Sequence, residues 1–259
     1  MALVKTEQSG GVCTVTLCDD AHRNALGRQL ITEMVEAFDA AEADDDVRVI
    51  VLTNEGSAFC AGANLSERSE ADADAPAAVS DPMHLFGRFA RSPKPYVGRL
   101  AGHCVAGGMG LAAAMDISVG LVDAKFGFTE VRIGVAPAVI SVVCLPKMRT
   151  ADARAAFLRG NRFDGAEAAR LGLINQAVTR DELDEAVDAV IEDLLAGSPN
   201  ALAVSKQLLA DVPEMSVEDA FAKTSRLSAE LFTTDEAREG MAAFLEKRPA
   251  PWVPSESAG

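Results

Sequence analysis

Apolar residues recur at two different spacings along the first part of the chain. From Val12 to Leu17, apolar and hydroxyl-bearing residues alternate, as in a strand with one buried face. Val47 to Thr53 is an almost continuous apolar run of strand length, which is typical of strands covered on both faces. Between these segments, apolar residues three or four apart mark one face of a helix: Leu26, Leu30, Met34, Phe38 and Ala41. This strand–helix–strand order predicts an α/β architecture.

The rest of the chain divides into a mixed part and a helical part. Residues 96–100 and 117–122 predict strands, with a glycine-rich junction and a short helix over 111–115 between them. Residues 66–82 are acidic, rich in Ala and interrupted by Pro, which predicts a surface loop or a frayed helix end. Beyond about residue 150 the spacing is helical, and Ser198-Pro199 has the pattern of a helix start. We therefore expect a core over residues 1–195 and a helical C-terminal region over residues 196–259.

Composition narrows the class of protein. Of the 259 residues, 49% are hydrophobic, which is enough for a packed core. The longest apolar runs are short, and the first residues lack a signal-peptide stretch, so we expect a cytoplasmic protein that does not enter a membrane. The net charge of −15 repels nucleic acid and anionic membranes. A polyanionic ligand would therefore need a local cluster of Lys or Arg.

Cysteine and histidine offer no metal-binding pattern. The five cysteines are scattered without a Cys-x-x-Cys pair, and the three histidines form no H-E-x-x-H pair. We expect buried free thiols and no metal site.

Two glycine-containing junctions could place backbone N–H groups beside a ligand. In the first, over residues 59–65, Asn64 could cap a helix with Glu67 completing a capping box, while Gly62 allows a tight turn. That arrangement leaves N–H groups near Ala63 free. The second junction, over residues 106–110, lies where a helix begins and its first N–H groups lack partners. Together they could form an oxyanion hole, although ordinary turns and close helix packing would use the same residues.

A dinucleotide-binding loop is the competing interpretation of the second junction. Gly108 to Ala113 fits the pattern G-x-G-x-x-A. However, only about two helical turns fit before the strand at Ile117, and a parallel crossover needs a dozen or more residues. Asp123 also comes too early for the ribose-binding acid. The spacing therefore disfavours this interpretation.

Glu130 is the candidate acid/base. It lies in a stretch of apolar residues and glycines over residues 124–134, where partial burial would raise the pKa of its carboxyl. The structural alternative is an ion pair with Arg132 or Lys125.

These segments together resemble the enoyl-CoA hydratase/isomerase (crotonase) family. Asn24-Ala25-Leu26 and the closing stretch from Glu239 to Arg248 extend the resemblance to nearly the whole chain. The resemblance implies an α/β fold with a crotonase-like ββα spiral core and a helical C-terminal trimerisation region. It also implies a homotrimer or homohexamer, and an acyl-CoA thioester substrate with no separate cofactor, because coenzyme A is part of the substrate.

The resemblance assigns roles to particular residues. Ala63 and Gly107 correspond to the two oxyanion-hole residues, and Glu130 corresponds to one catalytic glutamate. Arg23 and Lys247 could offset the negative charge of the chain, and Phe244 and Lys247 fall where a neighbouring subunit completes the site. The full set of implied substrate-binding residues is Arg23, Ala25, Ala61, Asn64, Leu65, Thr129, Phe244 and Lys247.

One departure bears on the reaction. The hydratases of the family use two glutamates, and the first of them falls on Gly110, whose position we expect to face the acyl group; His103 is a candidate replacement. Asn64 stands in place of an Asp, a mild change because both residues cap helices. We predict an enoyl-CoA hydratase of fatty-acid or related acyl-CoA metabolism that lacks the first glutamate. The alternatives are an enoyl-CoA delta-isomerase that uses Glu130 alone and a non-catalytic acyl-CoA-binding protein.

Overall fold

The computed structural model describes residues 2–70 and 82–254. Its larger sheet has six strands in the order β1-β2-β3-β5-β7-β9. In chain order these are β1 (Val4–Ser9), β2 (Val12–Leu17), β3 (Val49–Asn54), β5 (Tyr96–Leu100), β7 (Ile117–Leu121) and β9 (Gln176–Val178). The β1–β2 hairpin is antiparallel and every other pairing in this sheet is parallel.

A second, smaller sheet lies beside the first. Its three strands, β4 (Ala58–Cys60), β6 (His103–Val105) and β8 (Phe126–Gly127), pair in parallel in the order β4-β6-β8. Each of the β3–β4, β5–β6 and β7–β8 pairs gives one strand to each sheet, and a helical segment follows each pair. The chain thus winds as a ββα spiral, which confirms the predicted fold class.

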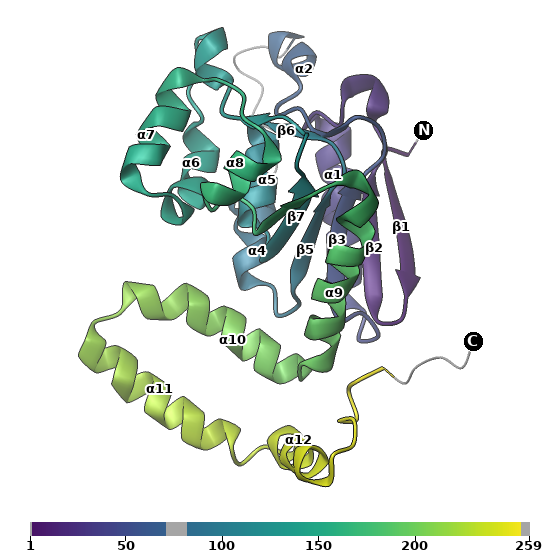
Figure 1. The fold of residues 1–259 in the computed structure, drawn as a ribbon, viewed down its shortest axis with the longest axis vertical. Helices are drawn as coiled ribbons and strands as arrows, with labels where there is room; N and C mark the ends of the chain where they lie inside the picture. Colours follow the sequence, from purple (N-terminus) through teal and green to yellow (C-terminus); the bar gives the residue numbers. More distant parts are fainter. Residues whose placement is uncertain (1, 71–81, 255–259) are drawn as a thin grey trace.

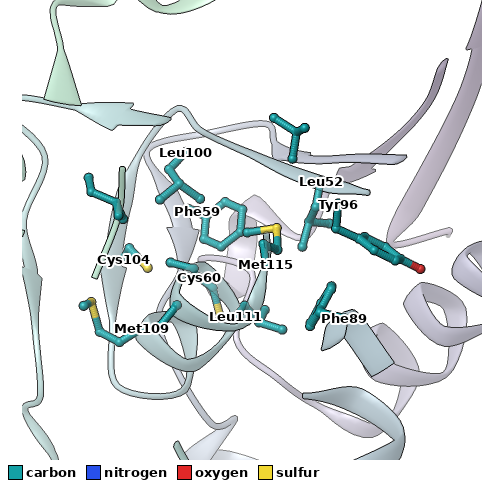
Figure 2. Packing of buried hydrophobic residues seen from close by; sticks show 14 of the residues in the cluster. Leu52, Phe59, Cys60, Phe89, Tyr96, Leu100, Cys104, Met109, Leu111 and Met115 are labelled. Atoms are coloured by element: carbon teal, nitrogen blue, oxygen red, sulfur yellow. The ribbon is translucent and has the colours of Figure 1, made fainter. Parts of the chain in front are cut away.

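The predicted hydrophobic patterns correspond to real buried faces. All six residues of β3 are buried, as expected for a strand covered on both sides. Helix α1 (Arg28–Ala43) buries Leu30, Met34, Phe38 and Ala41 of the predicted face; Leu26, also predicted on it, lies before the helix in a bridge with Ala63. Phe38 packs edge-on against Phe89 and Tyr96, with ring centroids 5.8 and 5.2 Å away. Figure 2 shows Phe89 and Tyr96 in this core together with Phe59, Cys60 and Cys104, all of which are completely buried.

Helices cover the sheets and extend the chain at its C-terminus. Those of the core are α2 (Leu65–Glu70), α3 (Pro82–Leu85), α4 (Arg88–Arg91), α5 (Gly107–Ala114), α6 (Ala138–Cys144), α7 (Thr150–Arg159), α8 (Gly165–Arg170) and α9 (Leu183–Ala196). Residues 66–70 of the predicted acidic loop are part of α2; residues 71–81 lie outside the described residues.

Three further helices, α10 (Pro199–Asp211), α11 (Val217–Leu231) and α12 (Asp235–Glu246), form an arm below the sheets (Figure 1). Ser198 caps α10 by accepting a hydrogen bond from the Ala201 N–H, as its sequence predicted.

The helices, the metal-ligand residues and the cysteines of the described chain bear on the predicted class of protein. Within residues 2–70 and 82–254, no helix has the length and apolar character needed to cross a bilayer. No cluster of His, Cys, Asp or Glu in the same ranges has the arrangement of a metal site. The cysteines are free, and all except Cys18 are buried, as predicted. The cytoplasmic location stays a prediction.

A buried ion pair fastens the first helix of the arm to the core. Lys206 of α10 donates to the Asp116 carboxylate at 2.6 Å and to the Lys94 carbonyl at 2.8 Å. Its ammonium also lies 5.6 Å from the centre of the Tyr96 ring. The Lys206 side chain is only 8% exposed, and the Asp116 side chain is 24% exposed.

We predict that Lys206→Met lowers the free energy of unfolding by about 3 kcal/mol, because it leaves the Asp116 carboxylate without its charged partner. The Lys223–Asp211 pair is a matched control, since it has the same 2.6 Å separation but both side chains are about 40% exposed. Lys223→Met should change stability by less than about 1 kcal/mol. Urea denaturation of both variants measures the difference, and equal effects would contradict a role for burial.

Candidate active site

The register of the small sheet brings three loop segments to one edge. Cys60 of β4 pairs with Cys104 of β6, and Cys104 pairs with Phe126 of β8. Because the three strands are parallel, the residues that follow them emerge at the same edge. Ala63 follows Cys60 by three residues, Gly107 follows Cys104 by three, and Glu130 follows Phe126 by four. The fold therefore collects the three predicted catalytic residues.

The Ala63 N–H is left free by the way its segment pairs. The Leu26 N–H donates to the Gly62 carbonyl at 2.6 Å, and the Asn64 N–H donates to the Leu26 carbonyl at 3.2 Å. This is a parallel bridge between Leu26 and Ala63, in which Ala63's own N–H points away from Leu26. The N–H has no acceptor among the described residues. It can therefore donate to a ligand.

Gly107 brings the second donor close to the first. It is the first residue of α5, so its N–H has no partner within the helix. A Cβ built on Gly107 would lie 3.7 Å from the Ala63 nitrogen, and one built on Gly62 would lie 3.1 Å from the Gly107 nitrogen. The two glycines thus let the two backbones approach closely, as an oxyanion hole requires.

Ala106 turns the backbone into this position at a cost. Its φ of 51° and ψ of −124° lie in a region that side chains other than glycine rarely occupy. Its N–H donates to the Gly127 carbonyl at 2.9 Å, which ties the start of α5 to β8. This strain could not be predicted from the sequence, because a small apolar residue before a helix is ordinary.

The loop after Ala63 is held differently from the prediction. The Asn64 side-chain oxygen accepts from the Ser66 N–H at 3.1 Å and so caps α2, as expected. The capping box, however, is wrong: the Glu67 carboxylate accepts from the Arg28 N–H at 2.8 Å instead of the Asn64 backbone. Glu67 thereby caps α1, whose own N-cap residue is Gly27 and has no side chain. This bond links the start of α1 to the segment that follows Ala63.

Glu130 is a half-buried carboxylate that forms no ion pair with the described residues. Its Oε2 is buried and has no hydrogen-bond partner among the described residues. Burial raises the pKa of the Glu130 carboxyl above its ordinary value. The alternative of an ion pair is wrong for Arg132, whose guanidinium donates to the Gly160 carbonyl at 2.5 Å. Lys125 forms no ion pair with Glu130 in the part of the chain that the structure describes.

The sequence led us to expect that position 110 faces the acyl group, but the space around it is filled by other side chains. Gly110 is buried, and a Cβ built on it would lie 2.4 Å from Ile140 Cγ2 and 2.9 Å from Phe86 Cε1. His103 does not replace the absent carboxylate: it is exposed at the start of β6, where its Nδ1 accepts from the Lys125 N–H at 3.0 Å.

The implied substrate-binding residues fall into two groups. The first group lies around Ala63. The Ala61 N–H donates to the Arg23 carbonyl at 3.1 Å and Leu26 pairs with Ala63, so residues 23–26 lie beside residues 61–64. This group contains Arg23, Ala25, Ala61, Asn64 and Leu65, and Thr129 directly precedes Glu130. The second group, Phe244 and Lys247 at the end of α12, lies at the opposite end of the molecule from α2 and β6 (Figure 1). The chain does not bring this second group to its own site.

The arrangement suits a reaction in which negative charge develops on one oxygen. Two backbone N–H groups can donate to that oxygen without reorganising, and a carboxylate with a raised pKa can exchange a proton with the adjacent carbon. Thioesters have such an acidic carbon next to the carbonyl.

Comparison with known proteins shows what the chain is similar to. Residues 7–255 match the sequence profile of the family described as Enoyl-CoA hydratase/isomerase. A Thermus thermophilus protein named as a candidate enoyl-CoA hydratase is 37% identical over 93% of this chain and 97% of its own length.

Solved structures agree over the same length. A Legionella pneumophila structure described as a candidate enoyl-CoA hydratase/isomerase (crotonase) superposes with a TM-score of 0.90 at 32% identity, covering 97% of this chain and 99% of its own. An enoyl-CoA hydratase from Mycobacterium smegmatis superposes with a TM-score of 0.88 at 28% identity, covering 96% of this chain and 98% of its own. Both alignments therefore include the core and the helical arm.

We predict that Ala106→Gly stabilises the fold by about 1 kcal/mol. Glycine removes the backbone strain at φ 51°, and part of that gain is offset by the greater freedom of glycine in the unfolded chain. Ala114→Gly, in the same helix at an ordinary conformation, is the control and should destabilise by about 0.5–1 kcal/mol. Denaturant unfolding measures both, and a loss of stability in both variants would show that Ala106 is not strained.

We also predict that Glu130→Gln is more stable than the wild type at neutral pH. Because the pKa of Glu130 is raised in the native state, the protonated form favours folding, and that contribution is lost as pH rises through the native pKa. Glutamine carries no charge to desolvate, so its advantage should fade below the ordinary pKa of glutamate. Thermal unfolding at several pH values tests this; an advantage that grows toward low pH would contradict it.

Proposed function

The chain belongs to the enoyl-CoA hydratase/isomerase family, and we propose that it converts enoyl-CoA thioesters through an enolate held by the Ala63 and Gly107 N–H groups. The observation that carries this proposal is the close approach of two unpaired backbone donors at the edge of the small sheet from which the Glu130 segment also emerges, with one carboxylate oxygen of Glu130 buried and without a partner. The donors would bind the thioester oxygen, whose charge grows as the enolate forms. Glu130 would move the proton.

Hydration of a 2-enoyl-CoA is the first form of this reaction. Water adds through its oxygen to C3, the electron pair of the double bond moves onto the thioester oxygen, and the resulting enolate accepts a proton at C2. Glu130 would take the proton from the water and deliver it to C2, so that one carboxylate serves both steps. The names of the relatives, which are enoyl-CoA hydratases, support this form.

Isomerisation of a 3-enoyl-CoA is the second candidate, and Gly110 favours it. Here Glu130 would remove a proton from C2, the dienolate would be held by the same two N–H groups, and the proton would return to C4. No water is added, so a second carboxylate has no task. The absence of a side chain at Gly110 is therefore no handicap for this reaction.

A purely binding role has less support. A protein that only bound acyl-CoA would gain nothing from a carboxylate that is desolvated and left without a partner. Glu130 is such a group, and it lies at the same edge as the two donors. Strained backbone at Ala106 in the same place also fits a catalytic site better than a passive one.

The proposal includes a trimer or hexamer in which a neighbouring subunit completes the coenzyme A site. Phe244 is 83% exposed and Leu245 is 79% exposed on α12, so an apolar surface of the arm has no partner within the described chain. The positions of Phe244 and Lys247, remote from their own site, support a contribution to another subunit's site.

We predict that Glu130→Gln lowers turnover by about 10² or more while acyl-CoA binding is retained. Crotonyl-CoA hydration and 3-enoyl-CoA isomerisation, with analysis of the products, measure the loss and also decide between the two reactions. Glu7→Gln on the exposed strand β1 is the control and should leave turnover unchanged. Turnover in Glu130→Gln equal to that of the wild type would refute the assignment.

We predict that light scattering detects a trimer or hexamer, and that Phe244→Ser weakens both assembly and acyl-CoA binding because it removes an exposed aromatic anchor. The exposed Leu158 of α7 offers a control on another surface, and Leu158→Ser should preserve binding. A monomer with full activity would overturn the shared site.

A further inference from the structure

Two apolar side chains fill the place where a second carboxylate would need to be. A Cβ at Gly110 would lie 2.4 Å from Ile140 Cγ2, 3.0 Å from Ile140 Cβ and 2.9 Å from Phe86 Cε1. Ile140 belongs to α6 and is 4% exposed, while Phe86 lies between α3 and α4. The space that a side chain at position 110 would occupy is therefore filled by Ile140 and Phe86, and is not an open cavity.

This apolar contact lies beside the reacting groups. Gly110 is three residues after Gly107 on α5, so the two positions share a face of that helix. Ile140 is four residues before Cys144 on α6 and shares a face with it. The Cys144 thiol is close enough to Glu130 for the carboxylate charge to contribute to its raised pKa, and it contacts the Met109 carbonyl of α5 at 3.8 Å. Ile140 thus lies against position 110 and on the same face of α6 as Cys144, the residue that is close to Glu130.

We propose that Ile140 and Phe86 form an apolar wall that makes this site selective for proton transfer over addition of water. The inference rests on the proposed function, since it assumes an enolate held by Ala63 and Gly107. Its new content is the identity of the residues that set the choice between the two reactions.

The chemistry of the two reactions explains the selectivity. Addition to C3 needs a water molecule held by acceptors in a fixed orientation, and a wall of aliphatic and aromatic carbon provides none. Proton transfer from C2 to C4 needs only Glu130: the C2–H bond breaks, the double bond shifts, and the same proton forms the C4–H bond. Apolar surroundings also favour this step, because they keep the pKa of Glu130 raised.

The wall also decides which variant could restore hydration. Gly110→Glu alone has no room, because its Cβ would meet Ile140 Cγ2, Ile140 Cβ and Phe86 Cε1 at once, and Ile140 Cβ is fixed by the backbone of α6. Ile140→Ala removes Cγ2, the nearest of these three atoms, so that a smaller shift of α6 and Phe86 admits the longer side chain. The informative protein is therefore the double variant Gly110→Glu/Ile140→Ala, compared with each single variant. Val142→Ala is the matched control, because Val142 lies on the same helix but is 72% exposed.

Three rates should be measured on each protein. Exchange of the C2 proton of butyryl-CoA in D₂O reports formation of the enolate without any hydration or isomerisation. Crotonyl-CoA hydration and 3-hexenoyl-CoA isomerisation report the two complete reactions. Circular dichroism and thermal unfolding establish which variants are folded.

We expect the wild type to exchange and isomerise, with hydration slower than isomerisation by about 10². The double variant should raise the ratio of hydration to exchange by about tenfold or more over the wild type, and Val142→Ala should leave this ratio unchanged. A wild type that hydrates as fast as it isomerises would overturn the inference, and that test needs no variant. A folded double variant with an unchanged ratio would overturn it too. Absence of exchange in the wild type would instead refute the proposed function itself.

Discussion

The parallel register of the three-stranded sheet is the constraint on which the site depends. Pairing of Cys60 with Cys104, and of Cys104 with Phe126, fixes where each following loop begins. These strands have only two or three residues each, so a shift of one residue would displace a whole loop and reverse its side chains. The surrounding core prevents such a shift, because Phe59, Cys60, Cys104 and Phe126 are completely buried.

Most of the site consists of backbone, and this explains its local composition. Two N–H groups can approach one oxygen only if their chains almost touch, which Gly62 and Gly107 permit. The strained conformation of Ala106 and the desolvated carboxylate of Glu130 both oppose folding. The large apolar core stabilises the fold against these local costs. A site of this kind lowers the stability of the fold, but its hydrogen-bond donors and its base need no rearrangement during the reaction.

The sequence predicted those features that depend on local pattern. Alternation and apolar runs located the strands and α1, and Ser198-Pro199 located the start of α10. The errors share a physical cause, since each involves contacts between segments far apart in the chain. Glu67 caps α1 across the loop instead of its own helix, and the room at Gly110 is taken by Ile140 from another helix. A lone sequence carries no local signal for either contact. The contribution of Phe244 and Lys247 to a neighbouring site stays a prediction for the same reason.

Polarisation of the bound thioester carbonyl tests the central claim most directly. An acyl-CoA labelled with ¹³C at C1 should show its carbonyl resonance moved downfield on binding, and its carbonyl stretch moved to lower wavenumber. Both shifts follow from two N–H groups drawing electron density onto one oxygen. They should persist in Glu130→Gln, because the donors are backbone groups of Ala63 and Gly107. A carbonyl that binds with the resonance and stretch it has in water would contradict the account.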